Sequence, residues 1–326
     1  KRDGFFFGTY AKDNLMFPER LREAGVRTVA AQAHRYFAAS AGFNQGFDVW
    51  EMVPGIKFDP QTDPNVTGPK HEEIAERLLG DPANTSGQFF AWFHFMDPHD
   101  VYVAHKEVPS YGHEPRDRYD GEVQFTDMQL GKLLDFVARQ PWASRTAIVV
   151  SADHGEGFGE HGVFRHGFEV YQELVRVPWF FVVPGIAPRR IDKPRGHIDM
   201  APTLLDLMGV AQGDAPLRGR SLVGEMLGRE PAEARDVIVD LPRTSDNDRR
   251  RALISGDHKL ISFGDDAYFR LYDLKEDPGE RNDLRKKDTQ ALSRMVERYR
   301  EHAKSIREVK PYACRKLKGA PEGRDH

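Results

Sequence analysis

A glycine-rich loop that directly follows a short apolar run constrains this chain more than any other stretch. Thr146–Val150 (TAIVV) is apolar and β-branched, which predicts a buried strand. Ser151–Gly162 (SADHGEGFGEHG) then combines glycines with carboxylate and imidazole side chains. Ligands of open α/β sheets bind beyond the carboxyl ends of the strands. The order of strand and loop therefore predicts a metal or oxyanion site at Ser151–Gly162.

Strands and helices alternate along the chain up to about Val210. Gln88–Met96 (QFFAWFHFM) is a nearly continuous apolar and aromatic run, which predicts a central parallel strand buried on both faces. Phe43–Trp50 is aromatic and contains glycine, which indicates a packed loop. Tyr119–Arg139 has the periodicity of a long amphipathic helix. The predicted apolar face of that helix comprises Val123, Leu130, Leu133, Leu134 and Val137. The alternation favours an α/β doubly wound domain.

The pattern changes after Gly213, where short strand-like runs are separated by Gly-Asp and Asp-Asp turns. These runs predict a small antiparallel sheet, followed by a final amphipathic helix over Thr289–Ile306. We therefore expect an α/β core over residues 1–213, a subdomain of sheet and helix over 214–310, and a basic tail over 311–326.

Composition excludes several classes of protein. The 326 residues carry a formal net charge of −4, which argues against a general polyanion binder, so no nucleic-acid partner is expected. Because Cys314 is the single cysteine, an internal disulfide framework and a multi-cysteine zinc site are excluded. No run of about 18 apolar residues occurs, so the sequence predicts no membrane span. Oligomeric state is left open.

Asp153 and His154 are the candidate metal ligands. A carboxylate oxygen beside an imidazole nitrogen suits a borderline divalent ion such as Mn²⁺ or Zn²⁺, whereas a carboxylate alone suits Ca²⁺ or Mg²⁺. We expect one divalent metal, Ca²⁺ or Mn²⁺ first and Zn²⁺ as the third candidate. The alternative is that Asp153 caps the following turn and His154 is an ordinary loop residue.

Two further histidines are candidates for direct contact with substrate. His166 follows the loop, where an imidazole near a metal can protonate a leaving group or bind anionic oxygens. His161 is given a supporting role, and either ring could instead orient Glu156 or Glu160. His99 ends the segment Met96-Asp97-Pro98-His99 at the carboxyl end of a predicted strand, with an ordinary loop histidine as its alternative.

Three weaker candidates lie nearby. Asp97 is expected to anchor the turn or the His99 ring. His197 and Asp199 surround the start of a predicted helix, where His197 could line the site and Asp199 could cap the helix.

Six segments in collinear order resemble the sulfatase family of the alkaline phosphatase superfamily. They are Phe89–Asp100, Tyr119–Phe136, Ser151–Gly162, His166–Pro178, His197–Val210 and Leu271–Leu284. The resemblance implies an alkaline-phosphatase-like α/β/α sandwich with a mixed, mostly parallel sheet and a small C-terminal antiparallel sheet.

The resemblance also implies roles for individual residues. Asp153 and His154 match positions that bind one divalent metal, and the histidine form is similar to the phosphonate monoester hydrolase and choline sulfatase branch. His99 matches the histidine that contacts the transferred sulfuryl or phosphoryl group. His166 matches a lysine or histidine that binds the anion.

One part of the family pattern is absent. Sulfatases carry a nucleophile in Cys/Ser-x-Pro-x-Arg, whose Cys or Ser becomes formylglycine, and metal-binding aspartates in the first strand. Neither motif occurs here, and Cys314-Arg315-Lys316-Leu317 is no substitute. In the family both precede a segment similar to Leu21–His34, so a missing N-terminal piece is expected.

The resemblance implies a metal-dependent sulfuric ester hydrolase that uses an upstream nucleophile on a small-molecule or glycan sulfate ester. The alternatives are a phosphodiesterase, phosphonate monoester hydrolase or phosphoethanolamine transferase of the same superfamily, and a non-catalytic anion-binding remnant. A periplasmic or extracellular location is favoured over a cytoplasmic one.

Overall fold

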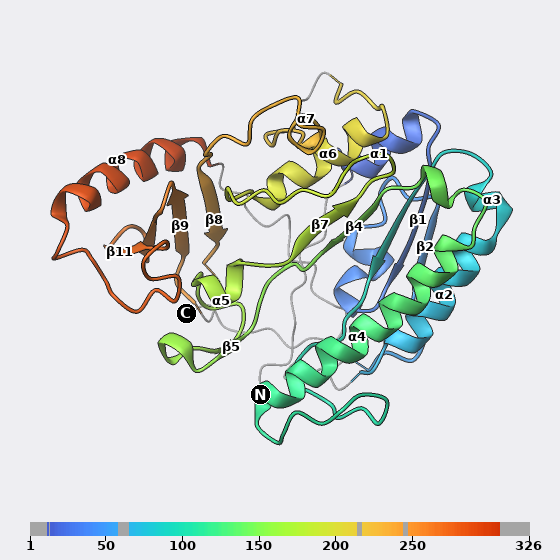
Figure 1. The fold of residues 1–326 in the computed structure, drawn as a ribbon, viewed down its shortest axis with the longest axis horizontal. Helices are drawn as coiled ribbons and strands as arrows, with labels where there is room; N and C mark the ends of the chain where they lie inside the picture. Colours follow the sequence, from blue (N-terminus) through green and yellow to red (C-terminus); the bar gives the residue numbers. More distant parts are fainter. Residues whose placement is uncertain (1–11, 13, 58–64, 214–216, 244–246, 307–326) are drawn as a thin grey trace, which may run out of the picture. The chain divides into compact units, whose positions relative to one another are not determined.

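The computed structural model describes residues 12, 14–57, 65–213, 217–243 and 247–306 (Figure 1). The chain divides into two compact units, one reaching Arg145 and one beginning at Thr146. Each unit is described by itself below. No helix of the described residues is long and apolar enough to cross a membrane. The domain boundary expected at Gly213 remains a prediction, and Cys314 and the basic tail lie outside the described residues.

The first unit is built on a parallel sheet in the order β2-β1-β3. Its strands are β1 (Arg27–Gln32), β2 (Val49–Met52) and β3 (Phe89–His94). Five of the six residues of β1 are buried, as expected for a central strand. The parallel strand predicted within Gln88–Met96 is confirmed as β3, but its predicted burial on both faces is wrong. All six residues of β3 are partly exposed, and β3 is an edge strand of this three-stranded sheet.

Helices α2 (Gly68–Gly80) and α4 (Pro115–Ala138) run side by side along this sheet (Figure 1). The shorter α1 (Phe17–Glu23) and α3 (Pro82–Thr85) pack on β1, and 3-10 turns occur at η1 (Arg35–Phe37), η2 (Ala39–Ala41) and η3 (Ala143–Arg145). The long helix predicted from periodicity is thus confirmed as α4. Its buried face differs from the prediction, because Val123 is exposed while Glu122 and Gln129 are buried.

The second unit begins with the strand that precedes the glycine-rich loop. β4 (Ile148–Ser151) pairs antiparallel with β7 (Trp179–Val182). Between them lies a short hairpin of β5 (Gly157–Phe158) and β6 (Phe164–Arg165), with a 3-10 turn η4 (Glu160–Gly162) at its tip. The helical segments between this hairpin and the C-terminal sheet are α5 (Gln172–Val175), η5 (His197–Asp199), α6 (Met200–Leu207) and α7 (Val223–Met226).

The predicted C-terminal antiparallel sheet is confirmed. Its order is β11-β10-β9-β8, and α8 packs against it (Figure 1). The strands are β8 (Val237–Leu241), β9 (Arg250–Ser255), β10 (His258–Phe263) and β11 (Tyr268–Asp273), and the helix is α8 (Thr289–Ser305). Because strand side chains alternate, Leu260 of β10 joins the cluster under α8, while Ile261 joins a second cluster around Val170 and Tyr171. The sheet therefore contributes to a core on both faces.

Candidate active site

The loop after β4 brings a carboxylate and an imidazole together. The Asp153 side chain is 72% exposed, and its Oδ2 lies 3.7 Å from Nε2 of His154. Nδ1 of His154 lies 2.9 Å from the carbonyl oxygen of Gly155. Since a carbonyl oxygen only accepts, Nδ1 carries the proton, and Nε2 is the nitrogen directed to Asp153. The loop thus presents one oxygen and one nitrogen donor side by side.

These two donors fit part of a divalent-metal site. A carboxylate oxygen with an imidazole Nε2 is a common ligand pair for Mn²⁺ and Zn²⁺, and an exposed carboxylate also suits Ca²⁺. No group of three or more candidate ligands occurs within the described part of the chain. A bound ion takes about four or more ligands, so Asp153 and His154 would supply only part of its coordination.

His166 lies against His154. The two ring centroids are 4.1 Å apart and the planes are inclined by 24°. Nδ1 of His166 is 3.1 Å from both carboxylate oxygens of Glu156, whose side chain is almost fully buried. The hairpin explains this contact, because pairing of Gly157 with Arg165 places the residues that flank β5 and β6 opposite each other. A buried carboxylate therefore holds the imidazole beside the candidate metal ligands.

His161 does not contact His154 or His166. Its Nδ1 is 2.8 Å from Oε1 of Glu173, and its Nε2 is 3.0 Å from the carbonyl oxygen of Glu280. The ring also stacks on Tyr171 with 3.8 Å between centroids. His161 therefore contacts α5 and the turn at Glu280, and its expected support of the candidate metal site remains a prediction.

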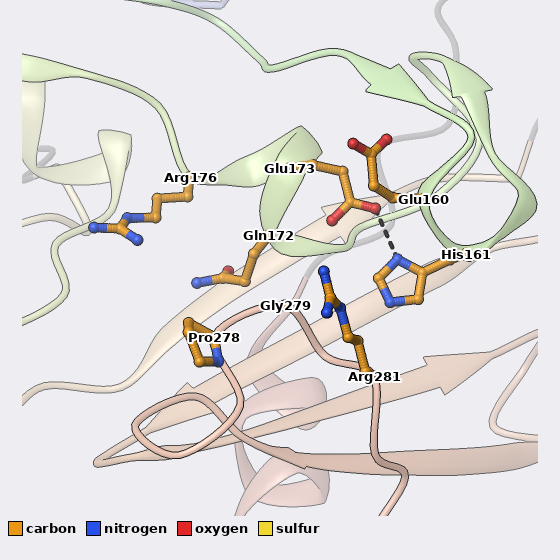
Figure 2. Close-up of a pocket in the computed structure, with 8 residues that line it drawn as sticks. All are labelled: Glu160, His161, Gln172, Glu173, Arg176, Pro278, Gly279 and Arg281. Carbon is orange, nitrogen blue, oxygen red and sulfur yellow. Dashed lines mark hydrogen bonds and ion pairs between the residues drawn. The ribbon is translucent and has the colours of Figure 1, made fainter.

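A cavity of about 660 Å³ lies beside His161, and most of the residues that line it are polar or charged (Figure 2). The lining residues are Glu160, His161, Gln172, Glu173, Arg176, Pro278, Gly279 and Arg281. None of the predicted site residues Asp153, His154 and His166 lines it. The cavity is therefore separate from the candidate metal ligands.

His197 supports the end of β4. Its Nε2 lies 2.8 Å from Oγ of Ser151, which in turn donates a hydrogen bond of 2.9 Å to the carbonyl oxygen of Pro178. Burial lowers the pKa of His197, although the charge of Asp153 opposes that shift. Asp199 accepts a hydrogen bond from the backbone of Arg220 and makes no side-chain cap for α6, so the expected helix cap is wrong.

His99 belongs to the first unit, in the loop after β3. Nδ1 of His99 is 2.9 Å from the carbonyl oxygen of Asp100, and its ring centroid is 6.5 Å from that of His34, which follows β1. Histidines thus meet at the carboxyl ends of two neighbouring parallel strands. The approach of His99 to Asp153 and His166 in the second unit remains a prediction.

The His99 loop is anchored by two buried carboxyls. Asp97 accepts hydrogen bonds from the amides of Thr67 and Gly68 and from the Thr67 hydroxyl, which fixes the loop to the start of α2. This confirms Asp97 as the anchor of the turn.

Glu122 of α4 accepts a hydrogen bond of 2.8 Å from the amide of Val103. Burial raises the pKa of Glu122 to about 8, although hydrogen bonds from the amides of Val103 and His99 oppose the rise. A pKa near 8 favours the protonated form of the Glu122 carboxyl at neutral pH.

Sequence reasoning missed Glu122, His34 and the partnership of Glu156 with His166. Glu122 gives one usable signal, a charged residue one position from the predicted apolar face of a long helix. Glu156 was named only as something an imidazole could orient. The hairpin register that aligns it with His166 involves two-residue strands, which leave no periodic pattern in the sequence.

Comparison with known proteins covers both parts of the chain. A family model described as Sulfatase matches residues 10–210, and one described as N-sulphoglucosamine sulphohydrolase, C-terminal, matches residues 159–307. The chain is similar to the Delta 4,5-hexuronate-2-O-sulfatase of Bacteroides thetaiotaomicron, with 28% identity over 206 residues, which are 57% of this chain and 41% of that protein. The chain spans less than half the length of the curated relatives it matches.

Solved structures share the fold. A 2-O GAG sulfatase matches with a TM-score of 0.73 and 21% identity, covering 91% of this chain and 76% of that one. A phosphonate monoester hydrolase from Silicibacter pomeroyi matches with a TM-score of 0.71 and 19% identity, covering 93% and 82%. These likenesses confirm the alkaline-phosphatase-like α/β fold with its small C-terminal antiparallel sheet. Because the sulfatase model matches more than half of the chain over residues 10–210, the chain belongs to the sulfatase family of the alkaline phosphatase superfamily.

Proposed function

We propose that this protein hydrolyses a sulfate ester with the help of one divalent metal. The observation that carries the proposal is the cluster of Asp153, His154 and His166 at the end of β4, where two oriented imidazoles lie beside an exposed carboxylate. Membership of the sulfatase family supports the same reaction. The names of the relatives support a sulfated glycan as the substrate class, since one acts on hexuronate 2-O-sulfate and a structural neighbour is a 2-O GAG sulfatase.

Asp153 and His154 would hold the metal, with further ligands from outside the described residues. When bound, a divalent ion supplies positive charge that polarises an ester oxygen. Among the described residues, the exposed carboxylate of Asp153 and Nε2 of His154 are the groups that we assign to it. Ca²⁺ and Mn²⁺ are the ions we favour, and Zn²⁺ is the third candidate.

His166 and His99 would act on the sulfuryl group itself. Because Nδ1 of His166 donates to Glu156, protons are exchanged at Nε2, on the opposite side of the ring. That nitrogen can bind a sulfate oxygen or protonate the leaving alkoxide. His99 would bind the equatorial oxygens. The nucleophile that the family resemblance implies, in Cys/Ser-x-Pro-x-Arg, is not among these 326 residues.

The test uses the complete gene product, matured so that a family nucleophile would be converted to formylglycine. Hydrolysis of sulfated uronic acid and glucosamine saccharides is measured for the wild type and for Asp153→Ala, His166→Ala and His99→Ala. We expect each substitution to lower kcat/KM by about 100-fold or more, since each removes a group that contacts the metal or the reacting ester. Full turnover by Asp153→Ala would overturn the assignment.

Phosphoryl transfer is the second candidate. His154 in the metal pair and the fold shared with a phosphonate monoester hydrolase support it. The same enzyme preparation assayed on matched aryl sulfate, aryl phosphonate monoester and phosphodiester substrates separates the two reactions. A kcat/KM on the phosphonate above that on the sulfate would favour the second candidate.

A further inference from the structure

The tip of the hairpin that leads to His166 is linked through His161 to α5 and to the turn at Glu280, which follows β11. Both ring nitrogens of His161 are engaged, Nδ1 by the Glu173 carboxylate and Nε2 by the Glu280 carbonyl. Figure 2 shows the first of these contacts, with the imidazole facing Glu173 at the edge of the cavity. His161 and Glu280 have left-handed backbones, with φ of 53° and 52°. Such conformations are unfavourable for non-glycine residues and persist where surrounding contacts enforce them.

Glu280 is buried and makes contacts in three directions. Its carbonyl oxygen faces His161, its Oε2 accepts a hydrogen bond from the backbone amide of Gln172 in α5, and its Oε1 lies 2.8 Å from Nζ of Lys259. The side chains of Lys259 and Glu280 are both 0% exposed. Nζ of Lys259 also lies 3.3 Å from the side-chain oxygen of Gln172. One turn therefore joins the hairpin tip, α5 and strand β10.

Burying this ion pair has a free-energy cost, because both charges lose their hydration. Burial lowers the pKa of Lys259 and raises that of Glu280, and their mutual attraction opposes both shifts. A buried pair often contributes no more stability than well-packed apolar side chains, yet losing one partner leaves an uncompensated charge. The pair also has a defined geometry. It connects Lys259 of β10 to the turn that contains Glu280, and so fixes the position of that turn against the sheet.

The β5–β6 hairpin connects the Glu280 turn to the candidate site. His161 fixes its tip, while at its base Glu156 precedes β5, His166 follows β6, and the two side chains are in contact. The two strands are only two residues long, so the contacts of His161 at the tip add to the few ladder bonds that define the orientation of the hairpin.

We propose that Lys259 and Glu280 are positioning residues, which set the place of His166 through His161 and the β5–β6 hairpin. The effect on turnover rests on the proposed sulfatase function. The effect on the His166 ring does not, so the two can fail separately.

The experiment compares Glu280→Gln, Lys259→Met and the double variant with the wild type, all as the complete gene product. Side-chain ¹⁵N–¹H correlation spectra report the ring nitrogens of His161 and His166, and steady-state kinetics report kcat and KM. We expect either single variant to shift the His166 ring signals and to lower kcat by about 10- to 100-fold, with KM changed by less than about threefold. His161→Phe, which keeps the stack on Tyr171 but removes both nitrogen contacts, should give the same pattern.

Leu260→Ala is the matched control. Leu260 neighbours Lys259 on β10, is equally buried, and faces the opposite side of the sheet. It should lower the Tm comparably while leaving the His166 signals and kcat unchanged.

The proposal is overturned if folded Lys259 and Glu280 variants keep wild-type His166 signals, or if Leu260→Ala lowers kcat as much as they do. Should both single variants fail to fold, the double variant and His161→Phe decide the question by the same readouts. If the wild type lacks sulfatase activity, the ring signals still test the positioning.

Discussion

The imidazole of His166 stacks on the imidazole of His154 with 4.1 Å between ring centroids. The two residues lie on opposite sides of the β5–β6 hairpin in sequence, and the hairpin returns the chain so that they meet. Each ring is held by its Nδ1, one by the carbonyl of Gly155 and the other by Glu156. The loop thus contains two imidazoles of defined orientation, and positioned imidazoles of this kind can bind anionic oxygens.

Glu156→Gln should lower kcat on a sulfate ester by about 10- to 100-fold without unfolding the protein. The substitution keeps the size of the side chain but removes the charge that holds Nδ1 of His166 at 3.1 Å. Steady-state kinetics at several pH values would measure the effect. Asp236→Asn is the control, because it alters another largely buried carboxylate that contacts a histidine. Asp236 directly precedes β8, and its Oδ2 lies 2.6 Å from Nε2 of His302 in α8. Equal kcat values for the two variants would contradict the assigned role of Glu156.

Removal of divalent metal should abolish turnover by the complete gene product, and Ca²⁺ or Mn²⁺ should restore it. Asp153→Asn should weaken metal binding at least about tenfold, because the asparagine side chain has no negative charge to attract the cation. Elemental analysis and calorimetric titration would measure metal content and affinity. Asp192→Asn is a control of similar exposure, with side chains 72% exposed at Asp153 and 76% at Asp192. Unchanged metal affinity in Asp153→Asn would exclude that carboxylate as a ligand.

The order of strands and helices could be predicted because each long element has its own periodicity. β2 was missed, since Val49–Met52 is short and follows a glycine-rich aromatic stretch that indicates a loop. It becomes a strand by parallel pairing with β1, a long-range contact that no local pattern encodes.

The candidate site was predictable where sequence neighbours act together and unpredictable where distant segments meet. Asp153 and His154 are adjacent in one loop, so a pattern suffices for them. Glu122 is buried because the loop at Val103 folds over α4, and Glu280 is buried because Lys259 of β10 faces it. Apolar periodicity places such carboxylates in solvent, and only tertiary contacts reverse that expectation.

Asp97→Ala should destabilise the protein by about 2–4 kcal/mol, because it leaves buried donors at the start of α2 without an acceptor. Asp97 accepts from the amides of Thr67 and Gly68 and from the Thr67 hydroxyl. Urea denaturation would measure the loss. Asp81→Ala removes a single exposed cap, the bond from the amide of Ala83 to Asp81 at the start of α3, and should cost about 1 kcal/mol or less. Similar losses for the two variants would contradict the buried anchor.

Glu122 should make the protein less stable as pH rises from about 6.5 to 8. Burial raises its pKa from 4.5 to about 8, so between these values the native state keeps a proton that the unfolded chain releases. The free energy of unfolding then falls with pH, by about 1 kcal/mol per unit from this group. Below about 6.5 His71 acts in the opposite direction, since burial lowers its pKa to about 4 and unfolding takes up a proton there.

Urea denaturation at half-unit steps between pH 6 and 8.5 would measure this slope in the wild type and in Glu122→Gln, which keeps an uncharged acceptor for the Val103 amide. The groups facing Glu122 are Asp97, Asp100 and His105. Burial lowers the pKa of His105, which disfavours a charged ring beside the Glu122 carboxyl. The wild-type slope should therefore be negative and the Glu122→Gln slope close to level. A wild-type curve that stays level, or a variant that keeps the slope, would show that Glu122 is ionised in the folded protein.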